Sequence, residues 1–115
     1  MPTSESMLPL QPAVFHILIA LADRERHGYS IMQDVAARTA GKVQLSAGTL
    51  YSSIRRMLEQ GLIEELNRSP DPSSTDERRR YYRLTCFGKR VAAAEVERLT
   101  ALVQQARATG LVPGI

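Results

Sequence analysis

The chain of 115 residues contains no tryptophan, two phenylalanines and a single cysteine, Cys86. One cysteine excludes an internal disulfide framework and any metal site built from several thiolates. We expect the Cys86 side chain to be buried and inert, in preference to a redox-sensing role. The two histidines, His16 and His27, do not have a metal-binding spacing. We therefore expect no metal ion and no other cofactor.

Long hydrophobic runs are also missing. The most apolar stretch, residues 13–22, is about ten residues long and includes His16, whereas a membrane helix needs about 20 residues. No Lys or Arg precedes this stretch, so the N-terminus is a poor match to a signal peptide. We expect a single-domain, cytoplasmic protein without a membrane partner.

No catalytic grouping is recognisable. The sequence has no phosphate-binding loop, and no nucleophile lies near an obvious base. His16 lies in an otherwise apolar stretch, which favours a structural role, and His27 beside Gly28 favours a local hydrogen bond in a turn. We expect that the protein is not an enzyme.

The sequence does contain a local concentration of positive charge. The formal net charge is only +3, yet six of the 15 basic residues lie between Arg78 and Arg90, with no acidic residue among them. The rest of the chain therefore holds nine basic residues against 12 acidic ones. Charge concentrated in this way is typical of a surface that binds an anionic partner.

Residues 45–61 have the pattern of an amphipathic helix. Ser46 suits the capping position before the first turn, and Gly61 suits the left-handed position after the last. The apolar stripe consists of Leu50, Ile54, Met57 and Leu58. The opposite face combines small residues with two adjacent arginines and consists of Gly48, Ser52, Arg55, Arg56 and Glu59. This pattern is typical of a DNA recognition helix.

Two further helices are predicted before this one. Pro12 suits a first helical turn, and the apolar spacing that follows predicts a helix over 11–23. Residues 23–27 are expected to be a charged connector, and a second helix is expected over 29–39. With the helix at 45–61, the arrangement is a helix-turn-helix.

A β-wing is predicted to follow. Residues 62–67 and 80–85 have strand composition, and residues 68–77 between them have the prolines and serines of a loop. We expect Tyr82 and Leu84 to face inward, while the basic residues of the second strand lie along a phosphate backbone. An exposed hairpin that is basic only for solubility remains the alternative.

The C-terminal part, from Thr85 to residue 108, is predicted to be one long helix with Thr85 as its cap. Its apolar residues have coiled-coil spacing, which favours a homodimer, with Val91 widening the seam. Folding of this helix over the first helix of its own chain is the alternative. The expected interface residues are Ala92, Val96, Leu99, Leu102, Val103 and Ala106. The predicted organisation is a flexible arm (1–10), a DNA-binding domain (11–84) and a dimerisation helix (85–110).

Four stretches together resemble the PadR family of bacterial transcriptional regulators. They read P-A-V-F-H-I-L-I-A-L-A-D (12–23), H-G-Y-S-I-M (27–32), G-T-L-Y-S-S-I-R-R-M-L-E-Q-G-L-I (48–63) and D-E-R-R-R-Y-Y-R-L-T-C-F-G (76–88). The resemblance covers about residues 8–110 and is greatest to the smaller members, which have a single C-terminal dimerisation helix. It implies a mostly α-helical winged helix-turn-helix homodimer that binds a palindromic operator, usually as a repressor.

The expected DNA contacts are of two kinds. Phosphate contacts, which supply salt-dependent affinity, are expected from Lys42, Arg55, Arg56, Arg78, Arg79 and Arg80. Major-groove contacts, where an arginine can bind guanine with two hydrogen bonds, are expected from Ser46, Gly48, Thr49, Ser52 and Arg56. Two roles are equally expected for Tyr51, namely a hydrogen bond from its hydroxyl to a phosphate, or packing alone.

The resemblance also implies a small-molecule effector, since some relatives release DNA when they bind an aromatic ligand. One relative stacks its ligand on tryptophans, which this chain lacks. A cavity between the C-terminal helix and the first helix is the expected place, with Phe15 and Phe87 as lining residues. Two other functions stay open, namely a protein-interaction module without DNA binding and a ligand sensor whose DNA binding is vestigial.

Overall fold

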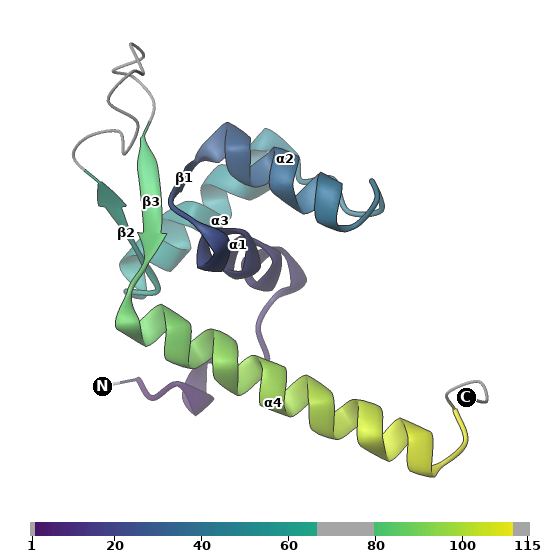
Figure 1. Ribbon diagram of the computed structural model, residues 1–115. Coiled ribbons are helices and arrows are strands. Elements are labelled where there is room, and N and C mark those ends of the chain that lie inside the picture. The colour runs from purple at the N-terminus through teal and green to yellow at the C-terminus, as the bar shows by residue number, and fades with distance from the viewer. Residues whose placement is uncertain (1, 67–79, 112–115) are drawn as a thin grey trace.

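The computed structural model describes residues 2–66 and 80–111 of the chain. They form a mostly helical fold with a small antiparallel sheet and a long C-terminal helix, as the sequence predicts (Figure 1). In chain order the elements are η1 (Glu5–Met7), α1 (Pro12–Asp23), β1 (Arg26–His27), α2 (Gly28–Arg38), α3 (Ala47–Glu59), β2 (Ile63–Leu66), β3 (Tyr81–Leu84) and α4 (Cys86–Ala108). Within the described ranges, no helix is both long enough and apolar enough to cross a membrane.

The helix α1 lies at the centre of the hydrophobic core. Pro12 begins it, at a position where the missing N–H breaks no helical hydrogen bond. Ile17 and Leu18 are completely buried, and α2, α3, α4 and β3 all contact this helix. The buried side chains of the core are Val14, Ile17, Leu18, Ala20, Leu21, Ile31, Val35, Leu50, Ile54, Met57, Leu62, Ile63, Tyr82 and Val91.

Side-chain caps fix where three helices begin, because each accepts a hydrogen bond from a free N–H of the first turn. The predicted caps Ser46 and Thr85 and the predicted local bond of His27 are all confirmed. Gly61 follows α3 with a φ of 76°, the left-handed conformation expected there. The three cap bonds run from Ser30 N–H to His27 Nδ1 (3.2 Å), from Thr49 N–H to Ser46 Oγ (3.1 Å) and from Gly88 N–H to Thr85 Oγ1 (2.9 Å).

The sheet has three antiparallel strands in the order β1–β3–β2. The strand β1 corrects the expected connector over 23–27, because Arg26 pairs with Tyr82 and His27 with Tyr81. The ring of His27 also meets the Tyr81 ring edge-on, with 5.3 Å between the ring centres. As a result Tyr81 is buried along with Tyr82, although only Tyr82 and Leu84 were expected to face inward. The loop predicted over 68–77 lies outside the described residues.

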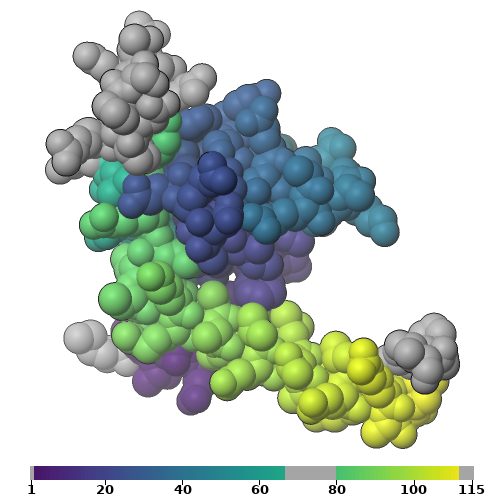
Figure 2. Space-filling model, in the orientation of Figure 1, coloured from purple at the N-terminus to yellow at the C-terminus, as the bar shows by residue number. Residues whose placement is uncertain are grey.

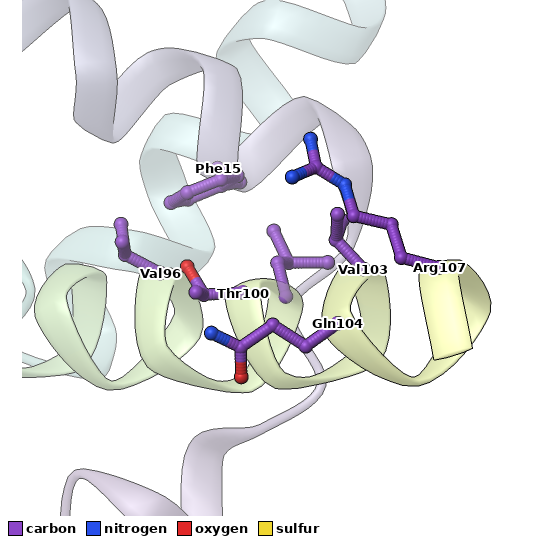
Figure 3. Close-up of a pocket in the computed structure, with 7 residues that line it drawn as sticks. Phe15, Val96, Thr100, Val103, Gln104 and Arg107 are labelled. Atoms are coloured by element: carbon purple, nitrogen blue, oxygen red, sulfur yellow. The ribbon is translucent and has the colours of Figure 1, made fainter. Parts of the chain in front are cut away.

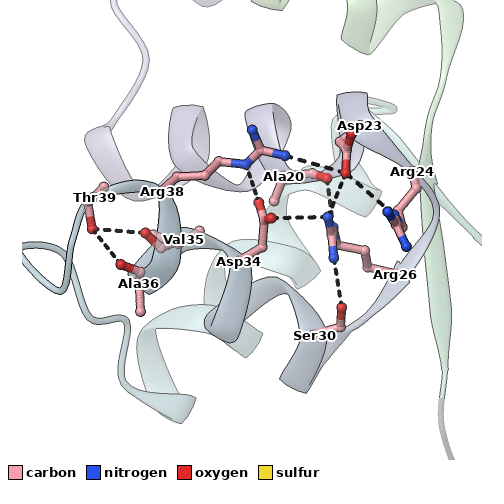
Figure 4. Close-up of polar contacts among 10 residues, drawn as sticks. All are labelled: Ala20, Asp23, Arg24, Arg26, Ser30, Asp34, Val35, Ala36, Arg38 and Thr39. Carbon is pink, nitrogen blue, oxygen red and sulfur yellow. Dashed lines mark hydrogen bonds and ion pairs between the residues drawn. The ribbon is translucent and has the colours of Figure 1, made fainter.

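Arg26 joins the end of α1 to α2. Its largely buried guanidinium donates to the carbonyl oxygen of Ala20 (3.0 Å) and to Ser30 Oγ (3.0 Å) (Figure 4). It also lies 2.8 Å from a carboxylate oxygen of Asp23 and 3.0 Å from one of Asp34. Because buried charges are stable only when they are paired and hydrogen-bonded, these contacts hold α2 in one orientation on α1.

Residues 5–10, expected to belong to a loose arm, instead lie against α4. Met7, Leu8 and Leu10 pack against the core, and the Leu10 N–H donates to Glu95 Oε2 at 2.8 Å. In Figure 1, η1 and α1 lie on opposite sides of α4. The apolar side chains of this segment explain the difference, since they bury surface that a loose arm leaves in water.

The long helix α4 has two parts. Its first turns pack on the domain, where Val91 is completely buried and Ala92 contacts the core. Its second part projects from the body of the molecule (Figures 1 and 2). There Val96, Leu102 and Val103 are each about half exposed, at 51, 47 and 47%. The first part of α4 therefore packs on its own domain, and the homodimer expected from the second part stays a prediction.

Cys86 is exposed at the beginning of α4, which corrects the expectation of a buried thiol. The apolar residue of this first turn that packs against the core is its neighbour Phe87. Successive helical residues point in directions about 100° apart, so Cys86 faces away from the core.

Candidate nucleic-acid interface

The helix α3 is amphipathic in the way the sequence predicts. Leu50, Ile54 and Met57 are between 0 and 2% exposed and hold the helix on the domain. Leu58 is the exception, because at 36% exposure it lies at the edge of the stripe. The opposite face is exposed over its whole length and consists of Gly48, Ser52, Arg55, Arg56 and Glu59.

The cations on and just before α3 have no counter-charge in the part of the chain that the structure describes. Among the described residues, Lys42, Arg55 and Arg56 are exposed and form no ion pair. Within residues 2–66 and 80–111, no carboxylate competes with a bound anion for these groups. By contrast, Arg26 and Arg38, in the neighbouring β1 and α2, are paired with Asp23 and Asp34. Three cations without an ion pair in the described ranges thus lie on and just before α3, and three more, Lys89, Arg90 and Arg107, lie on α4.

The wing is less positive than its sequence indicates. Arg83 lies 2.5 Å from Glu64, its partner on β2, and 3.9 Å from Glu25. The hydrogen bond from Glu64 raises the pKa of the Arg83 guanidinium above its ordinary value. Arg80 is mostly exposed and lies 3.5 Å from Glu65. The run of six cations is therefore partly neutralised by acids that precede it in the sequence. Arg78 and Arg79 lie outside the described residues.

The beginning of α3 is open to a close approach. A Cβ added to Gly48 would meet no atom within 4 Å. Ser46 and Thr49 are joined by a hydroxyl hydrogen bond of 3.1 Å, and Ser52 Oγ donates to the Thr49 carbonyl at 3.2 Å. These hydroxyls have partners within the helix, yet all three residues are exposed and each oxygen keeps spare acceptor capacity.

Tyr51 packs against α2 through its ring while remaining half exposed, at 51%. Its hydroxyl lies so close to Gly28 that a Cβ on this glycine would be 2.6 Å away. Packing, one of the two roles considered for Tyr51, is therefore observed. The hydroxyl lies beside the first turn of α2, and its hydrogen bond to a phosphate stays a prediction.

A groove separates α1 from the projecting part of α4 (Figure 3). Its volume is about 370 Å³, and Phe15 points into it from α1. The residues that line it are Phe15, Val96, Leu99, Thr100, Val103, Gln104 and Arg107. Phe87, expected beside Phe15, does not line this groove. It packs against the core instead, with the Arg90 guanidinium 5.8 Å from its ring centre.

Glu95 is a buried carboxylate that the sequence analysis missed. It is 1% exposed and accepts hydrogen bonds from the Leu10 N–H and the Arg98 guanidinium. Two features of the sequence bear on it. Glu95 lies four residues after Val91 and seven before Leu102, on the apolar side of the helix, and Arg98 follows three residues later, a spacing that is common on exposed helix faces. Elsewhere in residues 2–66 and 80–111, no three His, Cys, Asp or Glu side chains gather as a metal ion would require.

The compact helical core, the α2–α3 pair and the three-stranded wing define a winged helix-turn-helix protein, with α3 as its exposed basic helix. Residues 17–94 match the family described as transcriptional regulator PadR-like. This match spans more than half of the chain, so the protein belongs to the PadR-like family. The family consists of transcriptional regulators and not of enzymes.

The chain is also similar to individual proteins, in sequence or in fold. Over 73 residues the chain is 33% identical to protein X, an uncharacterised protein of Lysinibacillus sphaericus, and the aligned part covers 64% of each chain. The fold is similar to that of a PadR family transcription regulator from Clostridium difficile, with a TM-score of 0.71, 23% identity, and coverage of 86% of this chain and 98% of the other. It is also similar to Bacillus subtilis PadR, whose structure was solved with operator DNA. There the TM-score is 0.62, the identity 18%, and the coverage 76% of this chain and 48% of the other.

Proposed function

We propose that this PadR-like regulator binds a palindromic operator as a homodimer and represses transcription, with α3 in the major groove. The observation that carries the proposal is the exposed face of α3, where Arg55 and Arg56 have no ion pair among the described residues. An unpaired arginine can bind phosphate or the O6 and N7 atoms of guanine without first breaking an internal contact. Such a protein acts in the cytoplasm, where a bacterial chromosome lies.

The proposed DNA contacts keep the two kinds expected from the sequence. Arg56 and the beginning of α3 would contact bases, and the remaining cations would contact phosphates. The solved complex of Bacillus subtilis PadR with operator DNA supports a nucleic-acid partner for this fold. The proposed set is Lys42, Ser46, Gly48, Thr49, Tyr51, Ser52, Arg55, Arg56, Arg78, Arg79 and Arg80.

The homodimer is proposed from the second part of α4. Val96, Leu102 and Val103 are half exposed on a helix that projects from the domain, where a second copy would bury them. Burial of apolar surface is the main favourable contribution to such an association. Two α3 helices would then face half-sites about one helical turn apart.

A small ligand that releases the DNA is part of the same proposal. The groove between α1 and α4 is apolar, with Phe15 on one wall and Arg107 at one end. A flat apolar ligand could stack on Phe15, the one aromatic residue among those that line the groove.

Fluorescence anisotropy against duplexes that tile the region upstream of the protein's own gene tests the proposal. The titration is run at two salt concentrations with a scrambled duplex as competitor. We expect one tile to bind about a thousandfold more tightly than the scrambled duplex. Absence of binding at low salt would contradict the proposal and favour a protein-interaction module, whose basic surface meets an acidic partner. Equal, salt-sensitive binding to every tile would contradict sequence specificity.

A further inference from the structure

The carboxylate of Glu95 lies at the point where α4 leaves its own domain. Before it, Val91 is buried in the core, and directly after it Val96 is half exposed. Glu95 itself is 1% exposed, which is unusual for a charged residue unless both of its oxygens have partners. Here Oε2 accepts the Leu10 N–H at 2.8 Å and Oε1 accepts the Arg98 guanidinium.

The bond from Leu10 connects two distant parts of the chain. Leu10 lies two residues before α1, and α1 packs directly against α3. The preceding η1 contacts the other side of α4, so the N-terminal segment passes around this helix from one side to the other (Figure 1). The hydrogen bond therefore ties the middle of α4 to the helix that carries α3.

A helix held at one point can pivot, whereas a helix held at two points has a fixed direction. The first point is at Gly88, whose Cα packs against the backbone of Leu62. The second is Glu95, seven residues later, which is about 10 Å along the helix at 1.5 Å per residue. Another 13 residues, about 20 Å of helix, continue to Ala108, so a small change of angle at Glu95 becomes a large displacement at the far end.

We infer that Glu95 is a positioning residue, which, through Leu10 and the N-terminal segment, fixes the direction of α4 relative to the recognition helix α3. The buried hydrogen bond adds a contact with a preferred direction to the apolar packing of α4. In the homodimer proposed above, the direction of α4 sets the distance between the two α3 helices and so the spacing of half-sites. This consequence for DNA rests on the proposed function, but the fixing of α4 within one protomer does not.

Double electron–electron resonance tests the inference on the full-length protein. The parent protein for this experiment carries Cys86→Ser, which removes the exposed native thiol. Spin labels are attached to two cysteines introduced at exposed positions, Ser52→Cys on α3 and Ala101→Cys on α4. Dilution with unlabelled protein restricts the signal to pairs within one protomer. We expect a narrow distance distribution in the parent.

Two variants remove the hydrogen bond between Leu10 and Glu95, one at the acceptor and one at the donor. Glu95→Ala removes the acceptor, and a chain lacking residues 2–10 removes the donor, together with the η1 contacts, without changing the sequence of α4. We expect both to widen and shift the distribution, and hydrogen exchange of the Leu10 amide to accelerate in Glu95→Ala. The control is Glu97→Ala, which removes an exposed carboxylate from the same helix and should give the parental distribution. Melting curves confirm that each variant is folded at the temperature of measurement, since lost stability alone does not change this distance.

The distance distributions of the two variants distinguish the possible explanations. Widening in both variants supports the inference. A wider distribution in Glu95→Ala alone would mean that the cavity left by the side chain, and not the lost hydrogen bond, moves α4. A wider distribution in the truncated chain alone would show that Glu95 is not needed to fix α4. Either result overturns the inference. Parental distributions in both folded variants also overturn it. An undiluted sample labelled only at Ser52→Cys tests the homodimer separately, because a missing distance between protomers contradicts the dimer without affecting the result for α4.

Discussion

Gly88 lies so close to Leu62 that a Cβ on residue 88 would be 2.0 Å from the Leu62 carbonyl oxygen. The same carbonyl accepts a hydrogen bond from the Thr85 N–H at 3.2 Å, and the Thr85 hydroxyl donates to the carbonyl of Gly61 at 2.6 Å. The first turn of α4 is thereby fastened to the beginning of the wing. Contact with backbone cannot be relieved by rotating a side chain, so this position requires glycine.

We therefore expect Gly88→Ala to lower the free energy of unfolding by about 3 kcal/mol, the upper part of the range for overpacking. Urea denaturation monitored by circular dichroism measures this change. Gly48→Ala is the matched control, because its Cβ meets no atom within 4 Å and alanine favours the helix, so its stability should be unchanged or slightly higher. Equal stability of the two variants would show that the Gly88–Leu62 contact is not tight.

Glu95 should make the stability depend on pH in the acid range. The hydrogen bond from Arg98 holds the pKa of the Glu95 carboxyl below its ordinary value of 4.5, against the opposite effect of burial and with help from the Leu10 N–H. A pKa lowered by folding means that the ionised form stabilises the fold above the ordinary pKa. This contribution is lost as the pH falls through the lowered pKa.

Urea midpoints measured from about pH 7 to about pH 3 test this dependence. We expect Glu95→Gln to be less stable than the parent at neutral pH, with the difference shrinking as the pH falls below the ordinary pKa. Glu97→Gln, at an exposed carboxyl of the same helix, should follow the parent curve. A difference between Glu95→Gln and the parent that stays constant with pH would contradict the lowered pKa.

Arg56 and Arg83 should behave differently in DNA binding. If Arg56 contacts guanine, Arg56→Ala should weaken operator binding by about 1–3 kcal/mol. Arg83→Ala is the control, because this arginine is already paired with Glu64 and Glu25. Anisotropy titrations at several salt concentrations compare the two. Equal losses would mean that the wing contributes as much as α3, and an unchanged affinity for Arg56→Ala would remove this residue from the site.

The exposed part of α4 should control the oligomeric state. Val103→Glu puts a charge on the proposed seam, where the side chain is 47% exposed in one protomer. We expect a folded monomer by size-exclusion chromatography with light scattering. Ala101→Glu, two residues away and pointing about 200° around the helix, should remain dimeric. A parent that is monomeric at micromolar concentration, or a Val103→Glu variant that stays dimeric, would contradict the proposed interface.

The sequence predicted the helices well because their signals are local. Ser46 and Thr85 cap the helices they were expected to cap, and the apolar spacing of Leu50, Ile54 and Met57 assigned the buried side of α3 correctly. The spacing of apolar residues predicts which side of a helix is buried over a few turns. A capping residue is recognised by the hydrogen bond that its side chain accepts from an N–H three residues later.

Most of the errors concern contacts between distant parts of the chain. Arg26 and His27 form a strand only because β3 lies beside them, and Arg83 is neutralised by a glutamate on the opposite strand. Glu95 lies on the same side of α4 as Val91 and Leu102, but the N-terminal segment that covers it is distant in the sequence, so its hydrogen bond to Leu10 was not predicted. Phe87 was expected to line the groove with Phe15 only because both are aromatic. In the structure it packs against the core instead.

Hydroxyl-radical footprinting of the tightest-binding duplex tests whether a dimer binds DNA through both α3 helices, because it locates the two helices on DNA in one experiment. We expect two protected segments on one face of the duplex, with centres about 10 base pairs or a multiple of that apart. Both should weaken together in Arg56→Ala. A single protected segment, or protection spread evenly along the duplex, would contradict a dimer that reads DNA through paired recognition helices.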